Sequence, residues 1–259
     1  MISAHNISFT AGKKYLVKNV TAHFEGGEVV AIMGPNGAGK TTFLKMLAAG
    51  LPLHSGQVIF KEKSLPAYNA EDLAVERGVL SQFYQINFPV TVEEIIAMGR
   101  YPYFQLQPTE HDKVIIENVV RQLGIKHLFE RDYNSLSGGE AQKVQMARVL
   151  AQVWNDEGQS SKALFLDEPV SNLDIRYQHE ILGIARAYST KGNAVIAVLH
   201  DINLALQYAD RIYFMKDGVI MYEYQHGEDL SLDLLQQVFD IPFQTFTGPM
   251  NRPVLIPIV

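Results

Sequence analysis

The residues from Gly34 to Thr42, GPNGAGKTT, have the spacing of a phosphate-binding loop. They match the pattern G-x-x-x-x-G-K-[ST] without a gap, after an apolar run and before a helix-like segment. Glycines let the backbone amides close around phosphate oxygens, and the helix start adds partial positive charge. We expect Lys40 to reach the β- and γ-phosphates of a nucleotide and the Thr41 hydroxyl to ligate Mg²⁺. The predicted loop contacts are Gly34, Pro35, Asn36, Gly37, Ala38, Gly39, Lys40, Thr41 and Thr42.

Two adjacent acids, Asp167 and Glu168, follow the apolar residues ALFL at 163–166. Ligands of α/β proteins bind at the carboxyl ends of the strands, where such acids would lie. We expect Asp167 to hold Mg²⁺ through water and Glu168 to polarise the water that attacks the terminal phosphate. A solvated acidic turn is the alternative, and the phosphate-binding loop in the same chain argues against it.

His200 and Gln82 are further candidates at strand ends. His200 closes the apolar run AVIAVLH, where it could contact the γ-phosphate and orient water. Gln82 follows GVLS and could bind Mg²⁺ and water. Alone, a histidine here would more often be structural and a loop glutamine merely exposed. Both hypotheses therefore depend on the phosphate-binding loop.

A second anion-binding helix start lies in LSGGE at 136–140. Ser137 suits an N-cap, Gly138 and Gly139 leave the amides bare, and Glu140 ends the segment. The segment contains neither a lysine nor a magnesium ligand, so it cannot hold a nucleotide alone. We predict that it completes the site of a second copy. Two chains in a C₂ pair would bury two ATP molecules, each between Lys40 of one and Ser137 of the other.

Strand-like and helix-like segments alternate along the chain, which implies a largely parallel sheet covered by helices. The range 83–160 lacks strong strand signals and is interpreted as a helical insert, with a capping box predicted at Thr91 and Glu94. A hairpin around Asp217 and Gly218, a helix near 231–240 and an apolar tail follow. The predicted strands are 2–9, 17–24, 28–33, 56–60, 163–169 and 193–200.

The composition fits a globular protein and excludes several classes. The chain has 259 residues, is 47% hydrophobic and carries a net charge of -6, which disfavours a freestanding nucleic-acid binder. It contains no cysteine, which excludes disulfides and thiol catalysis. No apolar run approaches the ~20 residues of a membrane span, and the N-terminus lacks the core of a signal peptide. We expect a soluble, cytosolic chain.

The ordered motifs resemble those of the ATP-binding-cassette ATPases over nearly the whole chain. The resemblance implies an α/β P-loop NTPase with a mostly parallel sheet and an N-terminal antiparallel β subdomain. It implies one domain over 1–259, with a helical subdomain at about 83–160, and ATP and Mg²⁺ as ligands. It also implies that Ser171 to Asp174 communicate across the dimer, with Asp174 near the nucleotide. The motifs are Gly34–Thr41, Gln82, LSGGE at 136–140, LFLDEP at 164–169, SNLD at 171–174 and His200.

The resemblance extends to importers of iron chelates, haem and cobalamin. TVEEIIAMGRYPY at 91–103 and VLHDINLALQYADRI at 198–212 are similar to these. The longer connection WNDEGQSSK at 154–162, together with VLSQ and FPVTVEE, is most similar to the haem (hemin) importers. This implies that 83–107 meets a transmembrane permease dimer at the cytoplasmic face of the inner membrane. A periplasmic binding protein would act indirectly. Ferric siderophore and vitamin B12 are the alternative cargoes.

The chain departs from the family at the adenine-stacking aromatic. The family usually places it before the glycine of the first turn, where this chain has Ala11 before Gly12. We predict that Tyr15 substitutes for it; Phe9 is the alternative.

Other ATPase classes share the LSGGE motif. DNA-repair and chromosome ATPases carry long coiled-coil heptads between the two nucleotide motifs, and the 41–136 interval has none. Translation-associated cassettes carry two phosphate-binding loops, and this chain has one. A non-catalytic binding module would not need Lys40, Asp167 and Glu168 together.

Overall fold

A six-stranded sheet at the centre of the molecule positions the candidate residues. The computed structural model describes residues 1–81, 88–104, 106–154, 160–248 and 252–258. The strand order is β10-β9-β3-β8-β7-β6, with only β10 antiparallel to its neighbour. β3, β7 and β8 are buried throughout, as expected for parallel strands covered on both faces. The strands are β3 Val29–Met33, β6 Arg77–Leu80, β7 Ala163–Asp167, β8 Ala194–Val198, β9 Arg211–Lys216 and β10 Val219–Gln225.

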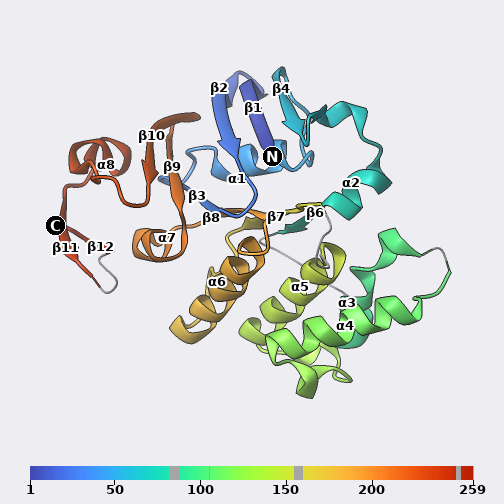
Figure 1. Cartoon of the computed structure of the whole chain (residues 1–259). Helices are drawn as coiled ribbons and strands as arrows, with labels where there is room; N and C mark the ends of the chain where they lie inside the picture. The colour runs from blue at the N-terminus through green and yellow to red at the C-terminus, as the bar shows by residue number, and fades with distance from the viewer. Residues whose placement is uncertain (82–87, 105, 155–159, 249–251, 259) are drawn as a thin grey trace.

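An antiparallel sheet of order β2-β1-β4-β5 lies above the central sheet, with helix α1 between them (Figure 1). One hydrophobic core joins α1, this sheet and one face of the central sheet. The predicted antiparallel N-terminal part and the strands within it are confirmed. The elements are β1 Ile2–Ala11, β2 Lys14–Phe24, β4 Ser55–Phe60, β5 Lys63–Ser64 and α1 Lys40–Leu47.

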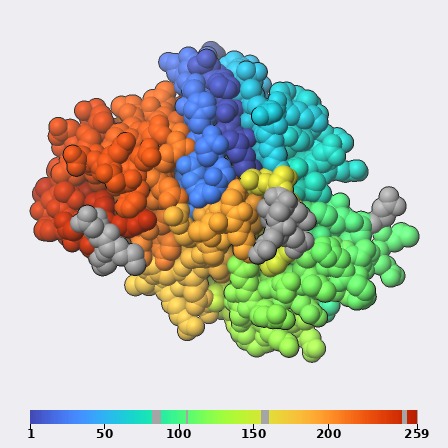
Figure 2. Space-filling view, in the orientation of Figure 1, coloured from blue at the N-terminus to red at the C-terminus, as the bar shows by residue number. Residues whose placement is uncertain are grey.

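The opposite face of the central sheet packs on helices, and the described residues between 88 and 160 contain helices and 3₁₀ turns but no named strand. These helices project to one side of the molecule, green in the space-filling view (Figure 2). The capping box at Thr91 and Glu94 is confirmed. Treating this part as an inserted subdomain stays a prediction. The helices are α3 Val92–Met98, α4 Glu110–Leu123 and α5 Gly138–Gln152, with turns η2 Tyr101–Tyr103, η3 Lys126–Leu128 and η4 Tyr133–Ser135.

The remaining elements include several that the sequence did not predict. Helix α2 and strand β6 occupy 70–80, and the apolar tail forms a hairpin with β11. β12 was not predicted because it has a proline at each end, and proline is uncommon within strands. The predicted hairpin at Asp217–Gly218 and the helix near 231–240 are confirmed. These elements are η1 Leu65–Ala67, α2 Ala70–Glu76, α6 Ile175–Ser189, α7 Ile202–Tyr208, α8 Leu232–Phe239, β11 Phe243–Thr247 and β12 Pro253–Pro257.

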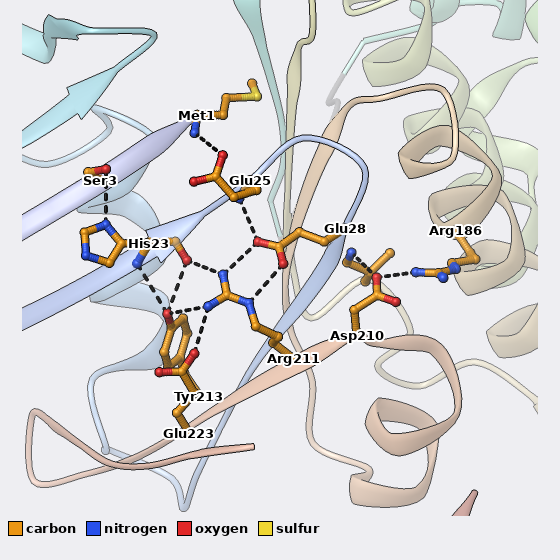
Figure 3. A network of polar contacts seen from close by, with 11 residues as sticks. Met1, Ser3, His23, Glu25, Glu28, Arg186, Asp210, Arg211, Tyr213 and Glu223 are labelled. Atoms are coloured by element: carbon orange, nitrogen blue, oxygen red, sulfur yellow. Dashed lines mark hydrogen bonds and ion pairs between the residues drawn. The ribbon is translucent and has the colours of Figure 1, made fainter. Parts of the chain in front are cut away.

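Arg211 on β9 ties the two sheets together (Figure 3). Its guanidinium donates to both carboxylate oxygens of Glu28, at 2.9 and 2.7 Å, and to the main-chain oxygen of His23 on β2. It also donates to Tyr213 and Glu223. The fork of an arginine can satisfy several acceptors at once, so one side chain fixes the end of β2 against β9.

Among the described residues, no helix has both the length and the apolar character required to cross a membrane.

Candidate functional site

The glycine-rich loop leaves β3 and opens α1 at the carboxyl edge of the central sheet. Gly39 has φ 98°, and a Cβ there would lie 2.1 Å from the main-chain oxygen of Leu16, so this position requires glycine. The Lys40 ammonium turns back into the loop and donates to the carbonyls of Gly34 at 2.9 Å and Pro35 at 3.0 Å. Burial lowers the pKa of Lys40, against the opposing effect of the nearby carboxylates Glu168 and Asp167. The ammonium group of Lys40 is therefore held within the loop by main-chain carbonyls.

Asp167 ends β7 beside the start of α1. The Thr41 hydroxyl donates to its Oδ1 at 2.8 Å, which joins the two predicted magnesium ligands directly. Asp167 is buried, and burial raises its pKa although the bond from Thr41 opposes the shift. β3, β8 and β7 are neighbours and run parallel, so their carboxyl ends bring these residues to one edge.

Glu168 and His200 form a close pair at the same edge. The His200 Nε2 lies 2.6 Å from Glu168 Oε1, and the Ser171 hydroxyl donates to the other oxygen at 3.0 Å. Glu168 has φ 51°, an uncommon conformation for this residue type that turns the backbone sharply after the strand. Burial opposes its ionisation, but the bonds from His200 and Ser171 outweigh burial and lower the pKa of Glu168. The carboxylate is thus ionised and oriented.

The loop, Glu168 and His200 surround one hollow of about 230 Å³. Leu16 on β2 also lines it and was not predicted from the sequence; its position just after the turn of the first hairpin was the available signal. Tyr15, the predicted adenine partner, is exposed on the hairpin and is not among the lining residues. Phe9 stacks on His54 instead. The lining residues are Leu16, Asn36, Gly37, Ala38, Gly39, Lys40, Thr41, Thr42, Glu168 and His200.

The LSGGE segment begins α5 and does not line this hollow. Ser137 is the N-cap, as predicted, and its hydroxyl accepts from the Glu140 amide. The Glu140 carboxylate accepts in turn from the Ser137 amide and hydroxyl, at 2.9 and 2.8 Å. Asp174 likewise caps α6 by accepting from the Tyr177 amide at 3.2 Å, and it is also outside the hollow. Gln82 lies outside the described residues.

The residues at the hollow suit a polyphosphate with a divalent cation. Amides at a helix start and an ammonium attract phosphate oxygens, and the Thr41 hydroxyl and Asp167 carboxylate are the hard oxygen donors that Mg²⁺ prefers. Among the described residues, no group of three or more His, Cys, Asp or Glu side chains is arranged to hold a metal. Thr41 and Asp167 supply two oxygens for such a cation, and oxygens of bound phosphates are further ligands that Mg²⁺ commonly takes.

Comparison with known proteins relates this arrangement to one family. The family model described as ABC transporter matches residues 17–171. The chain is 42% identical to the hemin import ATP-binding protein HmuV of Gloeobacter violaceus, over 100% of this chain and 94% of that protein. It is 39% identical to the protein of that name from Pseudomonas fluorescens, over 99% of both chains.

Solved structures agree on the fold. An inward-facing putative metal-chelate type ABC transporter superposes with a TM-score of 0.81, at 23% identity, over 100% of this chain and 97% of that chain. A dimeric bacterial ABC transporter cassette, MJ0796, gives 0.75 at 26% identity, over 88% and 100%. The mostly parallel sheet with an antiparallel N-terminal sheet and helices is thus shared with these cassettes.

Proposed function

The chain belongs to the ABC transporter family, and on that premise we propose that it is the ATP-hydrolysing subunit that energises hemin uptake through a partner permease. Hemin is assigned as the cargo because the chain is 42% and 39% identical to hemin import ATP-binding proteins, over 94% and 99% of the length of those proteins. Identity at this level extends over both ends of the chain and is not confined to the nucleotide motifs that all ABC ATPases share.

ATP binds at the hollow beside the glycine-rich loop in this proposal. The amides from Gly34 to Thr42 and the Lys40 ammonium hold its phosphates. Thr41, Asp167 and Gln82 would hold Mg²⁺, which neutralises phosphate charge when bound. Support comes from the 2.8 Å contact between Thr41 and Asp167 and from the burial of Lys40. Tyr15 remains the proposed partner of adenine.

Glu168 acts as the base that polarises the attacking water. Its lowered pKa keeps it ionised at neutral pH, and His200 and Ser171 fix its orientation. A positioned base contributes about 10²–10⁴-fold to a rate. His200 lies on the solvent side of Glu168, 41% exposed, where it can also contact the γ-phosphate.

A homodimer completes the site. In this proposal Ser137, Gly138, Gly139 and Glu140 of one copy close over the γ-phosphate bound to the other, with Asp174 at the interface. The hollow itself has no lining residue from 136–140 or 171–174, which supports a shared site. The cassette MJ0796, 26% identical, is dimeric, and a post-hydrolysis state of it holds ADP and Pi. Since ADP lacks the γ-phosphate, ATP and ADP favour different dimer states.

In this proposal the permease binds the surface of 83–107, of which 83–87 and 105 lie outside the described residues. Tyr101 and Leu106 in this range expose large apolar side chains, 59% and 93% accessible, which suits an apolar protein partner. The subunit then lies at the cytoplasmic face of the inner membrane, attached through the permease, and a periplasmic binding protein delivers cargo from the other side.

Reconstitution tests the cargo. The subunit and its permease are placed in proteoliposomes with the transporter's binding protein loaded with hemin, a ferric siderophore or cobalamin. We expect hemin alone to stimulate ATP hydrolysis and to be taken up, with Lys40→Ala inactive as the control. Stimulation by the siderophore or cobalamin, without stimulation by hemin, would reject the assignment.

A further inference from the structure

The carboxyl end of α5 is held by an unusual set of side chains. Four consecutive main-chain carbonyls, of Ala151, Gln152, Val153 and Trp154, each accept a hydrogen bond from a different side chain; we call them the α5 socket. Their donors are Arg100 Nη1 at 2.7 Å, Tyr103 OH at 2.7 Å, Tyr188 OH at 3.0 Å and Lys162 Nζ at 2.9 Å. The last carbonyls of a helix lack partners within it, and cations are favourable there.

Two of the four donors come from the segment just after α3. Arg100 is 3% exposed, pairs with Asp112 of α4 at 2.8 Å, and lies over the Tyr103 ring at 3.7 Å. The Lys162 ammonium also donates to the Tyr103 hydroxyl, at 3.1 Å. Gly99 brings this backbone against α5, since a Cβ there would lie 2.1 Å from the Arg148 carbonyl oxygen. The segment therefore cannot shift without moving the end of α5 or breaking these bonds.

The opposite end of α5 begins at Ser137, which caps it. A helix of 15 residues is roughly 22 Å long at 1.5 Å per residue. Hydrogen bonds along a helix resist stretching and sharp bending unless a proline or bulge interrupts them, and α5 has no proline. If the socket moves, α5 moves as a rigid unit and displaces the LSGGE segment at its other end.

The same short segment has two faces. Tyr101, within η2, turns outward and is exposed, whereas Arg100 and Tyr103 turn inward to the socket. Resting on the function proposed above, we propose that Arg100 and Tyr103 are positioning residues that transmit permease movement through the α5 socket to Ser137–Gly139. Coupling would then pass through α5 from the permease surface to the γ-phosphate of the partner copy.

The socket supplies its own matched control. Tyr103→Phe and Tyr188→Phe each remove one hydroxyl that donates to a carbonyl at the same helix end, although the Tyr103 hydroxyl also contacts the Val75 carbonyl at 3.3 Å and accepts from Lys162. Tyr188 belongs to α6 and not to the permease-facing segment. A purely structural role for the socket predicts similar effects of the two variants, whereas transmission from the segment predicts that only Tyr103→Phe uncouples.

The experiment measures ATP hydrolysis by the wild-type and both variant subunits, alone and assembled with the permease in proteoliposomes carrying loaded binding protein. The readout is the ratio of stimulated to unstimulated rate, with co-elution of subunit and permease and the melting temperature measured in parallel. We expect Tyr103→Phe to lower the ratio roughly fivefold or more, at the lower end of ordinary coupling between sites. Tyr188→Phe should keep the wild-type ratio.

Three results overturn the inference: an unchanged ratio for Tyr103→Phe, equal loss in both variants, or loss of co-elution by Tyr103→Phe, which would make the residue part of the docking contact. Failure of the wild-type subunit to be stimulated at all is a different result, because it rejects the proposed function itself.

Discussion

Two adjacent acids, Asp167 and Glu168, sit in opposite electrostatic environments. Burial raises the pKa of Asp167 despite the bond from Thr41. Burial acts on Glu168 in the same direction, but His200 and Ser171 reverse the outcome and its pKa falls. Burial thus disfavours the charge on Asp167, a cost that a bound cation would offset, whereas hydrogen bonds favour the charged form of Glu168.

Glu168→Gln should preserve nucleotide binding and abolish turnover. The amide keeps the size of the carboxylate but cannot accept a proton, so we expect a loss of about 10²–10⁴-fold in kcat. ATP should then accumulate on a dimer that elutes early in size-exclusion chromatography. Glu117→Gln, an exposed change on α4, is the control. Normal hydrolysis by Glu168→Gln would remove Glu168 from its assigned role.

Asp167→Asn should stabilise the nucleotide-free protein while weakening Mg²⁺-dependent ATP binding. Replacing a buried charge with a neutral amide removes a desolvation cost, so we expect a gain of roughly 0.5–2 kcal/mol in unfolding free energy near neutral pH. The measurement is urea unfolding without nucleotide, alongside ATP titration with Mg²⁺.

The pH dependence of that gain has a defined sign. The folded protein binds a proton at Asp167 more tightly than the unfolded chain does, because burial raises the pKa of Asp167. Wild type therefore gains stability relative to Asp167→Asn as pH falls through the folded pKa. A difference that grows toward acid pH would contradict this electrostatic account.

Single side chains also fix how whole elements meet. Arg211 holds β9 to Glu28 and to the end of β2, and Glu25 and Met1 extend the network into the antiparallel sheet (Figure 3). This sheet contributes Leu16 to the nucleotide hollow and its carbonyl to the close approach at Gly39. Its attachment therefore affects the shape of the loop.

Arg211→Ala should destabilise the protein by roughly 2–4 kcal/mol, because Glu28 would keep its charge in a largely buried place without its partner. Glu223, which is 48% exposed, is another partner of Arg211. Glu223→Gln should lower the free energy of unfolding by only about 0–1 kcal/mol. Chemical denaturation of both variants measures these losses in unfolding free energy. Equal small losses would mean that Arg211 forms only weak surface ion pairs and does not stabilise the contact between the two sheets.

At the scale of the whole molecule, the separation of the two predicted anion-binding helix starts is the main feature. The hollow at α1 and the N-terminus of α5 lie in different parts of one chain. Lys40 and Glu168 line the hollow, whereas at the start of α5 the Glu140 carboxylate accepts from Ser137. A dimer with two shared sites uses both helix starts.

Mixing Lys40→Ala with Ser137→Arg chains should restore hydrolysis that neither variant shows alone. Half of the dimers would be mixed and each would keep one intact site, so we expect about a quarter of the wild-type rate for independent sites. An equimolar mixture of wild type with Lys40→Ala measures the activity of dimers with one intact site, once the contribution of the wild-type dimers, about a quarter of all dimers, is subtracted. If those dimers are active but the mixture of the two variants is not, the shared-site hypothesis is wrong.

The sequence by itself determined the local chemistry and most of the elements. The glycine spacing from Gly34, the capping box at Thr91 and the apolar runs of β3, β7 and β8 are encoded in neighbouring residues, so periodicity and motif context predict them. β12 was not predicted, because its pairing with β11 and the burial of Leu255 depend on distant contacts.

Only the tertiary structure decided which partners the functional side chains have. Three sets of contacts were not visible in the sequence: the bonds of His200 and Ser171 to Glu168, the place of Leu16 in the lining of the hollow, and the contacts of Arg100 and Tyr103 with the α5 socket. Each joins residues brought together by strand order or helix packing. The balance between burial and hydrogen bonding at such places depends on atoms from several elements, which local sequence does not specify.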